Sequence, residues 1–202
     1  MEPSPSNVTG LRLRSHSGAW YRFDPGALCL ELLPTGGPGE FARWETLHTP
    51  QAFDDWLGAC RLRPTPELTA RAPEMAAVRR LRDALWGLVL ARVASRPLPE
   101  AELTTLNAAA AHPPLSPALA PDGTRAWAAG GTVEQLLSTV ARDAVELFTG
   151  PFAERIRMCA ADNCQLVYAD TSRPGRRRWC AMEHCGNLHK TRALRTRRAT
   201  PP

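Results

Sequence analysis

Residues 159–164 and 180–185 read Cys-Ala-Ala-Asp-Asn-Cys and Cys-Ala-Met-Glu-His-Cys, and no other stretch of the chain is as specific. Each stretch places four residues between its cysteines, and fifteen residues separate Cys164 from Cys180. Structural zinc sites take four ligands at the corners of a tetrahedron, commonly as two short-spaced pairs on separate turns. The spacing therefore predicts one structural Zn²⁺ ion bound by all four cysteines, with a β-hairpin between the two pairs.

Two disulfides or four buried free thiols are the alternatives to a metal. The first residues, MEPSPSNVTG, have neither the basic start nor the apolar run of a secretory signal, so disulfides are not expected. Four cysteines fill a closed tetrahedral site, which makes His184 and His189 surface residues in this interpretation and leaves no open position for a catalytic metal. Cys29 and Cys60 follow apolar patterns and are interpreted as buried free thiols.

The C-terminal cysteine region contains Trp179-Cys180-x-Met182-x-x-Cys185-Gly186-Asn187, the preceding Arg176-Arg177-Arg178, and Tyr168-x-Asp170-x-Ser172-Arg173. In these residues it resembles the CGNR zinc-finger family of bacterial proteins, whose Phe-x-Asp-x-Ser-Arg element is matched by the stretch that begins at Tyr168. The fourth residue of the family motif is usually Arg, whereas this chain has Leu188, followed by His189 and Lys190. That departure removes one basic group from the motif.

Local patterns predict how the finger is built. Gln165 to Ala169 can form a strand, residues 171–175 a turn, and residues 176–179 a segment that returns toward the metal. Leu188, Thr191 and Leu194 recur every three residues, which predicts a helix beginning at the last cysteine. A knuckle, a hairpin and a helix that carries a ligand make a treble-clef or ribbon-like finger.

Several side chains of the finger have expected structural roles. Tyr168 and Trp179 are interpreted as its miniature core, because so small a module has little else to bury. Four thiolates around Zn²⁺ carry a formal charge of −2, which favours nearby N–H groups and arginines. Asp170 is expected to hold one of the three arginines at 176–178, and Ser172 to cap the turn.

The charge of the chain is concentrated at its C-terminal end. The 202 residues carry a net charge of +5, but residues 154–202 hold eleven Lys and Arg against four Asp and Glu, so residues 1–153 carry −2. This asymmetry predicts an anionic partner, with nucleic acid first and DNA ahead of RNA. The candidate contacts are Arg176, Arg177, Arg178, Lys190, Arg192, Arg195, Arg197 and Arg198. The alternative is a solvated basic tail at the C-terminal end of a helix, where the helix dipole favours cations.

The N-terminal part reads as a globular unit of short strands and helices. Two or three strands are predicted within residues 11–33, and a hairpin around Pro121-Asp122-Gly123. Three helices are predicted to begin at Thr49-Pro50, Pro73 and Pro99. A fourth is predicted to begin at the Thr132/Gln135 capping box and to end at Gly150-Pro151. The cluster Arg79, Arg80 and Arg82 is interpreted as solvated surface. No apolar run reaches membrane-spanning length, so a cytoplasmic protein without membrane contact is expected.

The order of these elements also resembles the ABATE domain, which precedes the CGNR finger in that family and is regarded as a stress-responsive regulatory domain. The matching pieces are Thr49 to Leu57, Pro73 to Val93, Leu98 to Asn107 and Asp143 to Phe148; the family's Asp-x-x-Asn-Thr appears as Glu31-Leu-Leu-Pro34-Thr35. The expected architecture is an α+β, predominantly helical domain with a small antiparallel sheet over residues 1–150, followed by a zinc finger with a basic helix over residues 151–202.

These observations predict a bacterial transcription regulator whose finger contacts DNA. Its N-terminal domain would sense a signal, with a possible small-molecule effector, or form a possible homodimer. An RNA-binding module and a structural finger for protein contacts are the alternatives. An enzyme is not expected, because no nucleophile and base, or pair of acids, stands out.

Overall fold

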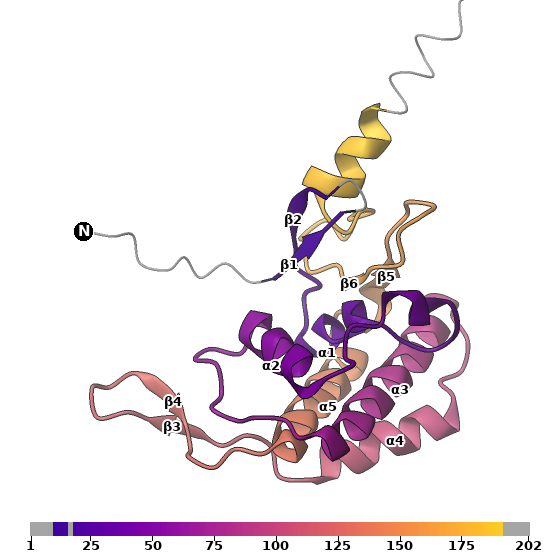
Figure 1. The fold of residues 1–202 in the computed structure, drawn as a ribbon. Helices are drawn as coiled ribbons and strands as arrows, with labels where there is room; N and C mark the ends of the chain where they lie inside the picture. Colours follow the sequence, from indigo (N-terminus) through magenta and orange to yellow (C-terminus); the bar gives the residue numbers. More distant parts are fainter. Residues whose placement is uncertain (1–9, 16–17, 192–202) are drawn as a thin grey trace, which may run out of the picture.

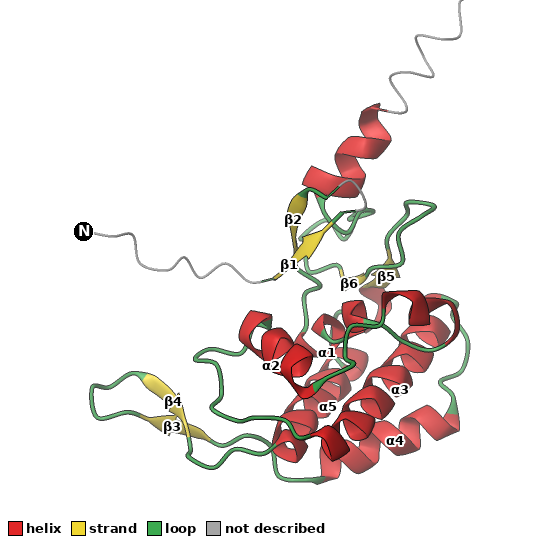
Figure 2. Ribbon diagram, in the orientation of Figure 1, coloured by secondary structure: helices red, strands yellow, loops and turns green. Residues whose placement is uncertain are grey.

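The computed structural model describes residues 10–15 and 18–191 (Figures 1 and 2). The helices bounded within this part are α1 (Leu28–Glu31), α2 (Pro50–Ala59), α3 (Met75–Val93), α4 (Glu100–Ala111) and α5 (Val133–Thr149). Its strands form three antiparallel pairs: β1 (Leu11–Arg14) with β2 (Trp20–Phe23), β3 (Pro117–Leu119) with β4 (Arg125–Trp127), and β5 (Ile156–Met158) with β6 (Val167–Ala169). This confirms the predicted class, a mostly helical N-terminal part with small antiparallel hairpins and a four-cysteine module.

The helical part is built around the packing of α3, α4 and α5, with α1 against α5. The inward stripe of α3 contains Val78, Leu81 and Leu85, all almost completely buried. The predicted capping box begins α5: Gln135 N donates to Thr132 Oγ1 at 3.2 Å, and Thr132 N donates to Gln135 Oε1 at 3.0 Å. These bonds satisfy two backbone donors that the first helical turn leaves without partners. None of the described helices combines the length and the apolar character needed to cross a bilayer.

Of the two or three strands predicted within residues 11–33, two form, and one other expectation for the helical part was wrong. The apolar run at residues 27–33 forms α1 and a 3-10 turn at Leu33–Thr35 and not a third strand. Its residues are buried on every side, and a continuous apolar run does not distinguish a buried strand from a buried helix. Arg82, interpreted as solvated, is 1 % exposed because it is paired with Glu45 inside the protein.

The β1–β2 hairpin packs on the cysteine module, although most of the chain separates the two in sequence (Figure 1). Phe23 is completely buried in one cluster with Tyr168 and three of the four cysteines, and Leu13 and Tyr21 pack against that cluster. Arg22 N also donates to Glu183 Oε1 at 2.6 Å. The finger thus rests on residues from both ends of the described chain. The domain boundary at residue 150 stays a prediction.

Candidate metal centre

The first cysteine pair lies in the loop that connects β5 to β6. Cys159 follows β5 directly and Cys164 shortly precedes β6, whose register pairs Met158 with Val167. Cys159 N donates to Leu166 O at 2.9 Å, which extends the pairing by one step and fixes the loop between the two cysteines.

The prediction of a hairpin between the two cysteine pairs was wrong, because it paired the strand after Cys164 with the wrong segment. The strand after Cys164 forms as predicted, but it pairs with β5, which precedes Cys159. Residues 176–179 return toward the cysteines as expected without forming a strand. A hydrogen bond of 2.9 Å from Ala160 N to Arg178 O connects this returning segment to the loop of the first cysteine pair.

The second cysteine pair lies at the start of the C-terminal helix. Cys185 belongs to a π-helical turn at Met182–Gly186, and residues 187–191 continue it as α-helix. The prediction that the last ligand begins a helix is therefore confirmed over the described residues.

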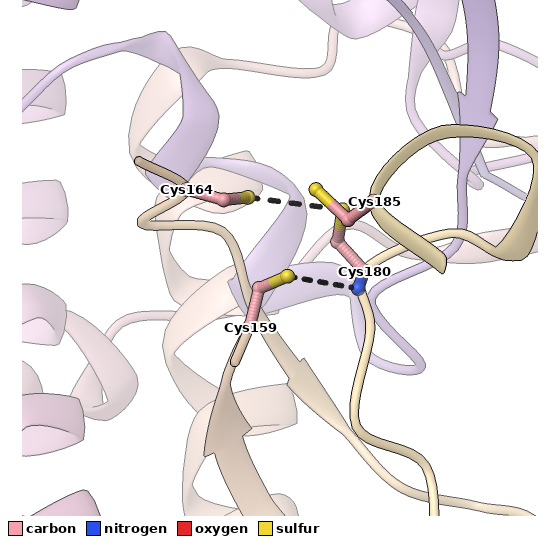
Figure 3. A group of neighbouring side chains, drawn as sticks. All are labelled: Cys159, Cys164, Cys180 and Cys185. Carbon is pink, nitrogen blue, oxygen red and sulfur yellow. Dashed lines mark hydrogen bonds between the residues drawn. The ribbon is translucent and has the colours of Figure 1, made fainter. Parts of the chain in front are cut away.

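The four cysteines form one compact cluster (Figure 3). Their Sγ atoms all lie within 4.8 Å of one another, and Cys164 Sγ lies 3.7 Å from Cys180 Sγ. A tetrahedral Zn–S₄ site with bonds of about 2.3 Å has sulfur–sulfur edges of roughly 3.8 Å, whereas a disulfide needs about 2.05 Å. All six cysteines are free thiols, with Cys29 and Cys60 completely buried elsewhere as predicted. The donor set and its spacing fit a closed site for one structural zinc ion.

The ionisation of the thiols points to the same conclusion. Hydrogen bonds from the Cys164 and Cys180 thiols lower the pKa of Cys159, so this sulfur ionises first. The pKa of Cys164 is raised, mainly by its hydrogen bond to Cys159, and that of Cys185 mainly by burial. Sulfurs this close cannot all be thiolates without a cation between them. A divalent ion removes this conflict, because it binds thiolates and holds them deprotonated.

Arg177 connects the metal centre to the N-terminal hairpin. Its guanidinium donates to Trp179 O at 3.0 Å, to Asp24 O at 2.9 Å and to Cys180 O, and it lies 4.0 Å from the centre of the Tyr168 ring. Tyr168 Oη in turn donates to Arg177 O at 2.8 Å. Tyr168 is completely buried and Trp179 partly buried, in agreement with their expected place in the core of the finger.

Asp170 organises the turn that leads back to the second cysteine pair. Its carboxylate accepts hydrogen bonds from Ser172 N at 3.0 Å, Ser172 Oγ at 2.6 Å and Arg177 N at 2.8 Å. Burial raises the pKa of Asp170, but these hydrogen bonds lower it by more, so the carboxylate stays ionised below its usual range. Its contribution to stability is present above the unfolded pKa of about 3.9 and is lost as the pH falls through the lower folded value. Asp170 holds Arg177 as expected, through its backbone N–H, but the group that caps the turn is the Asp170 carboxylate and not the Ser172 hydroxyl.

Replacing Asp170 with alanine should destabilise the zinc-loaded protein by about 2–4 kcal/mol, because three donors lose a charged acceptor. Asp170→Asn should cost less, since an amide oxygen still accepts. Asp162→Ala, an exposed carboxylate of the same module, is the control and should stay within about 0.5 kcal/mol of wild type. Urea unfolding of the three variants measures the differences. Equal losses for Asp170→Ala and Asp162→Ala would contradict the role given to Asp170.

Comparison with known families covers most of the chain. Residues 26–151 match the ABATE family, whose description is "putative stress-induced transcription regulator". The chain belongs to the ABATE family. Residues 155–198 match the CGNR zinc finger. No curated protein matches the chain. The cysteine cluster is therefore the metal site of a CGNR finger attached to an ABATE domain.

In this ABATE-family chain the predicted nucleic-acid contacts fall into three groups. Arg176, Arg178 and Lys190 are exposed, with the Arg178 guanidinium 5.2 Å from the centre of the Trp179 ring. Arg177 is partly buried and its guanidinium makes the contacts described above. The remaining four, Arg192, Arg195, Arg197 and Arg198, lie outside the described residues.

The outward face of the β1–β2 hairpin adds basic residues that sequence reasoning missed. The register pairs Arg12 with Arg22 and Arg14 with Trp20, so these four side chains share one face. Trp20 is 58 % exposed, and the Arg12 guanidinium lies 4.9 Å from its ring centre. The alternation Leu11-Arg12-Leu13-Arg14 was the available signal, because alternate residues of a strand point to opposite faces. What the sequence did not reveal was that the hairpin packs on the finger.

Arg22 also meets the arginine run of the finger across a shallow concave surface. Its lining includes four arginines and two apolar side chains: Arg22, Arg176, Arg177, Arg178, Trp179 and Met182. Asp24 and Glu183 line it as well, so four arginines face two carboxylates. The surface is positively charged overall and is contributed by both ends of the described chain.

Proposed function

We infer that this ABATE-family chain is a cytoplasmic bacterial transcription regulator that binds DNA through its zinc finger and the adjoining β1–β2 hairpin. The helical part would sense a signal or mediate dimerisation. The zinc ion is structural in this proposal: it holds the two cysteine pairs together and so positions the basic residues around them. The chemistry of the molecule is then recognition rather than catalysis.

The observation that carries the proposal is the basic surface shared by the finger and the hairpin. Arg22, Arg176 and Arg178 have exposed side chains beside one concavity, and the hairpin presents Trp20 between further arginines. Arginines bind phosphates through charge and paired N–H donors, and an exposed ring offers a stacking surface. We favour DNA over RNA as the partner, because the description of the matching family refers to transcription. Single-stranded RNA could stack its bases on the same tryptophan.

The test is a salt titration of binding to duplex DNA, single-stranded DNA and RNA of mixed sequence. Each arginine that contacts phosphate contributes about −0.9 to the slope of log K against log salt on duplex DNA. Substituting Arg22, Arg176 and Arg178 by alanine should therefore flatten the slope by up to roughly 3. The Arg192→Ala/Arg195→Ala/Arg198→Ala variant tests the basic tail in the same way.

The matched control is Arg80→Ala/Arg96→Ala/Arg125→Ala, which removes the same charge from exposed sites in the helical part and its hairpin. Its slope should equal that of wild type. Equal flattening in this control would mean that only net charge matters. A steeper slope and tighter binding on RNA would favour the RNA-binding alternative, and no binding to any polymer at low salt would leave the finger a protein-contact module.

A further inference from the structure

A cavity of about 430 Å³ lies where the helical part, the β1–β2 hairpin and the zinc finger meet. Cavities of 300–1,000 Å³ lined mostly by apolar and aromatic groups are the usual size and character of small-molecule sites. Leu33, Pro34 and Gly36 contribute to the wall from the helical part, and Leu166 and Leu188 from the finger. Each of the three parts of the protein therefore supplies some of the lining.

Four aromatic side chains line the cavity: Tyr21, Phe41, Trp44 and Trp86. Phe41 and Trp86 stack with their ring centres 3.8 Å apart and their planes 15° from parallel. Tyr21 stacks on His184 with centres 4.3 Å apart, so the finger holds this ring in place. Flat walls of this kind favour a flat aromatic guest, because offset stacking adds to the gain from apolar burial.

The helical wall is held in shape before any ligand arrives. Trp86 Nε1 donates to Gly36 O at 2.7 Å, and Arg82 is paired with Glu45 just beyond this loop. A Cβ at Gly37 would lie 2.5 Å from Trp86 Nε1, so the loop can approach the ring this closely only with glycine. A preformed wall reduces the ordering cost that a ligand would otherwise have to offset.

The charges around the cavity favour an uncharged ligand. Arg14 is the one lining residue, among those described, with a permanent charge, and its guanidinium is engaged on the outward face of the hairpin: Nε donates to Gly18 O at 3.1 Å, and the group lies 6.0 Å from the centre of the Trp20 ring. The finger wall includes Cys164 and Cys185, which with two further thiolates give the loaded zinc site a formal charge of −2, so an anion would be repelled. A ligand of either charge would lose its water and find no oppositely charged side chain of the lining to pair with, which an uncharged ligand avoids.

The finger wall connects the cavity to the metal centre. Asn163, Cys164, Gln165 and Leu166 line the cavity from the loop that holds the first cysteine pair. Gln165 Nε2 also donates to Glu40 Oε2 in the helical part, so this loop already contacts the helical part beside the cavity. A ligand that fills the space would press on both sides of this contact.

We propose that this cavity binds an uncharged, planar aromatic small molecule, and that its occupancy changes the affinity of the finger for nucleic acid. The second half rests on the nucleic-acid binding proposed above. Because the lining joins the hairpin and finger to the helical part, a ligand that prefers one arrangement of these parts shifts the population toward it. By linkage, nucleic acid then alters ligand affinity by the same factor.

The first experiment measures binding of 2-naphthol to the full-length, zinc-loaded protein by ligand-observed NMR. Leu166→Trp places a bulky ring in the cavity and Trp44→Ala removes one of its rings; each should weaken binding at least about tenfold, or 1.4 kcal/mol. Trp127→Ala, a tryptophan of the β3–β4 hairpin away from the cavity, is the matched control and should bind as wild type does. Zinc content is measured for every variant, so that loss of the metal is recognised.

Two charged probes of similar shape, 2-naphthoate and 2-naphthylmethylammonium, test the charge argument and should both bind several-fold more weakly. No saturable binding of 2-naphthol by the wild type, or equal binding by wild type, Leu166→Trp and Trp44→Ala, would overturn the site. Equal binding of either charged probe would overturn the assignment of an uncharged ligand.

The second experiment repeats the duplex DNA titration with saturating 2-naphthol. An affinity change of threefold or more that Leu166→Trp abolishes supports the coupling, and identical affinities overturn it. If the wild type binds no nucleic acid without the probe, the proposed function and the coupling both fail. The cavity is then still judged by the first experiment, so the two failures are distinguishable.

Discussion

Removal of the metal is expected to unfold the second cysteine segment and to release the β1–β2 hairpin with it, while β5, β6, α3, α4 and α5 stay folded. The core shared by the hairpin and the cysteines is little more than Phe23, Tyr168 and the cysteines, because Ile156, Val167 and Ala169 of β5 and β6 pack into the core of the helical part. So small a core cannot hold the module without zinc, whose binding contributes about 10–16 kcal/mol in comparable small domains. Cys180→Ser should have the same effect as chelation, because it removes one of the four thiolates.

Hydrogen exchange before and after chelation measures this prediction. Amides in residues 11–23 and 176–187 should lose protection together, whereas those of β5, β6 and the three helices keep theirs. Cys60→Ala is the matched control, since Cys60 is buried in the helical core and should leave one zinc ion per chain. A hairpin that stays protected after the metal has gone would contradict the single core assigned to hairpin and finger.

Arg82→Met is expected to destabilise the helical part by about 3–5 kcal/mol, the usual cost of leaving one partner of a buried ion pair alone. Arg82 donates to both carboxylate oxygens of Glu45, at 2.8 and 2.7 Å, and to Asp83 at 3.0 Å. Burial raises the pKa of Glu45, but its bonds with Arg82 lower it by more. The stability that this pKa shift contributes is present above the unfolded pKa of about 4.3 and is lost as the pH falls through the folded value.

Urea unfolding followed by helical circular dichroism measures the loss. Arg80→Met, an exposed arginine of the same helix, should change stability by less than about 0.5 kcal/mol. Arg82→Met/Glu45→Gln should recover part of the loss, because the more buried charge of Glu45 is then removed and only the more exposed Asp83 carboxylate loses its partner. An Arg82→Met protein as stable as Arg80→Met would show that the pair contributes nothing.

The features that could be predicted from the sequence are those specified by neighbouring residues. Cysteine spacing predicted the metal cluster, and Thr132 with Gln135 marked the start of α5, because the ligands or caps lie within a few residues of one another. The turn around residues 121–123 likewise predicted the β3–β4 hairpin. In each case the deciding interaction is local.

The features that escaped prediction depend on contacts between distant residues. Nothing near Arg82 indicates that Glu45 will meet it inside the protein, and the wrong hairpin partner for β6 reflects a choice between two adjacent segments. The aromatic cavity escaped for the same reason, because its walls come from segments far apart in the chain, from Leu13 to Leu188. Periodicity identifies a buried face but not what covers it.

The packing of the β1–β2 hairpin on the finger also determines when this part of the protein can be completed during synthesis. The contact between Arg22 and Glu183 spans 161 residues. At 5–20 residues per second, the ribosome needs roughly 10–30 s to make the intervening chain. During that interval nothing covers Phe23 and Tyr21 of the hairpin, whereas the helical part, whose last helix ends at Thr149, can fold before residue 183 is made. The finger is therefore assembled last, and a nascent chain that stalls before Cys185 carries an exposed apolar hairpin for chaperones and proteases to recognise.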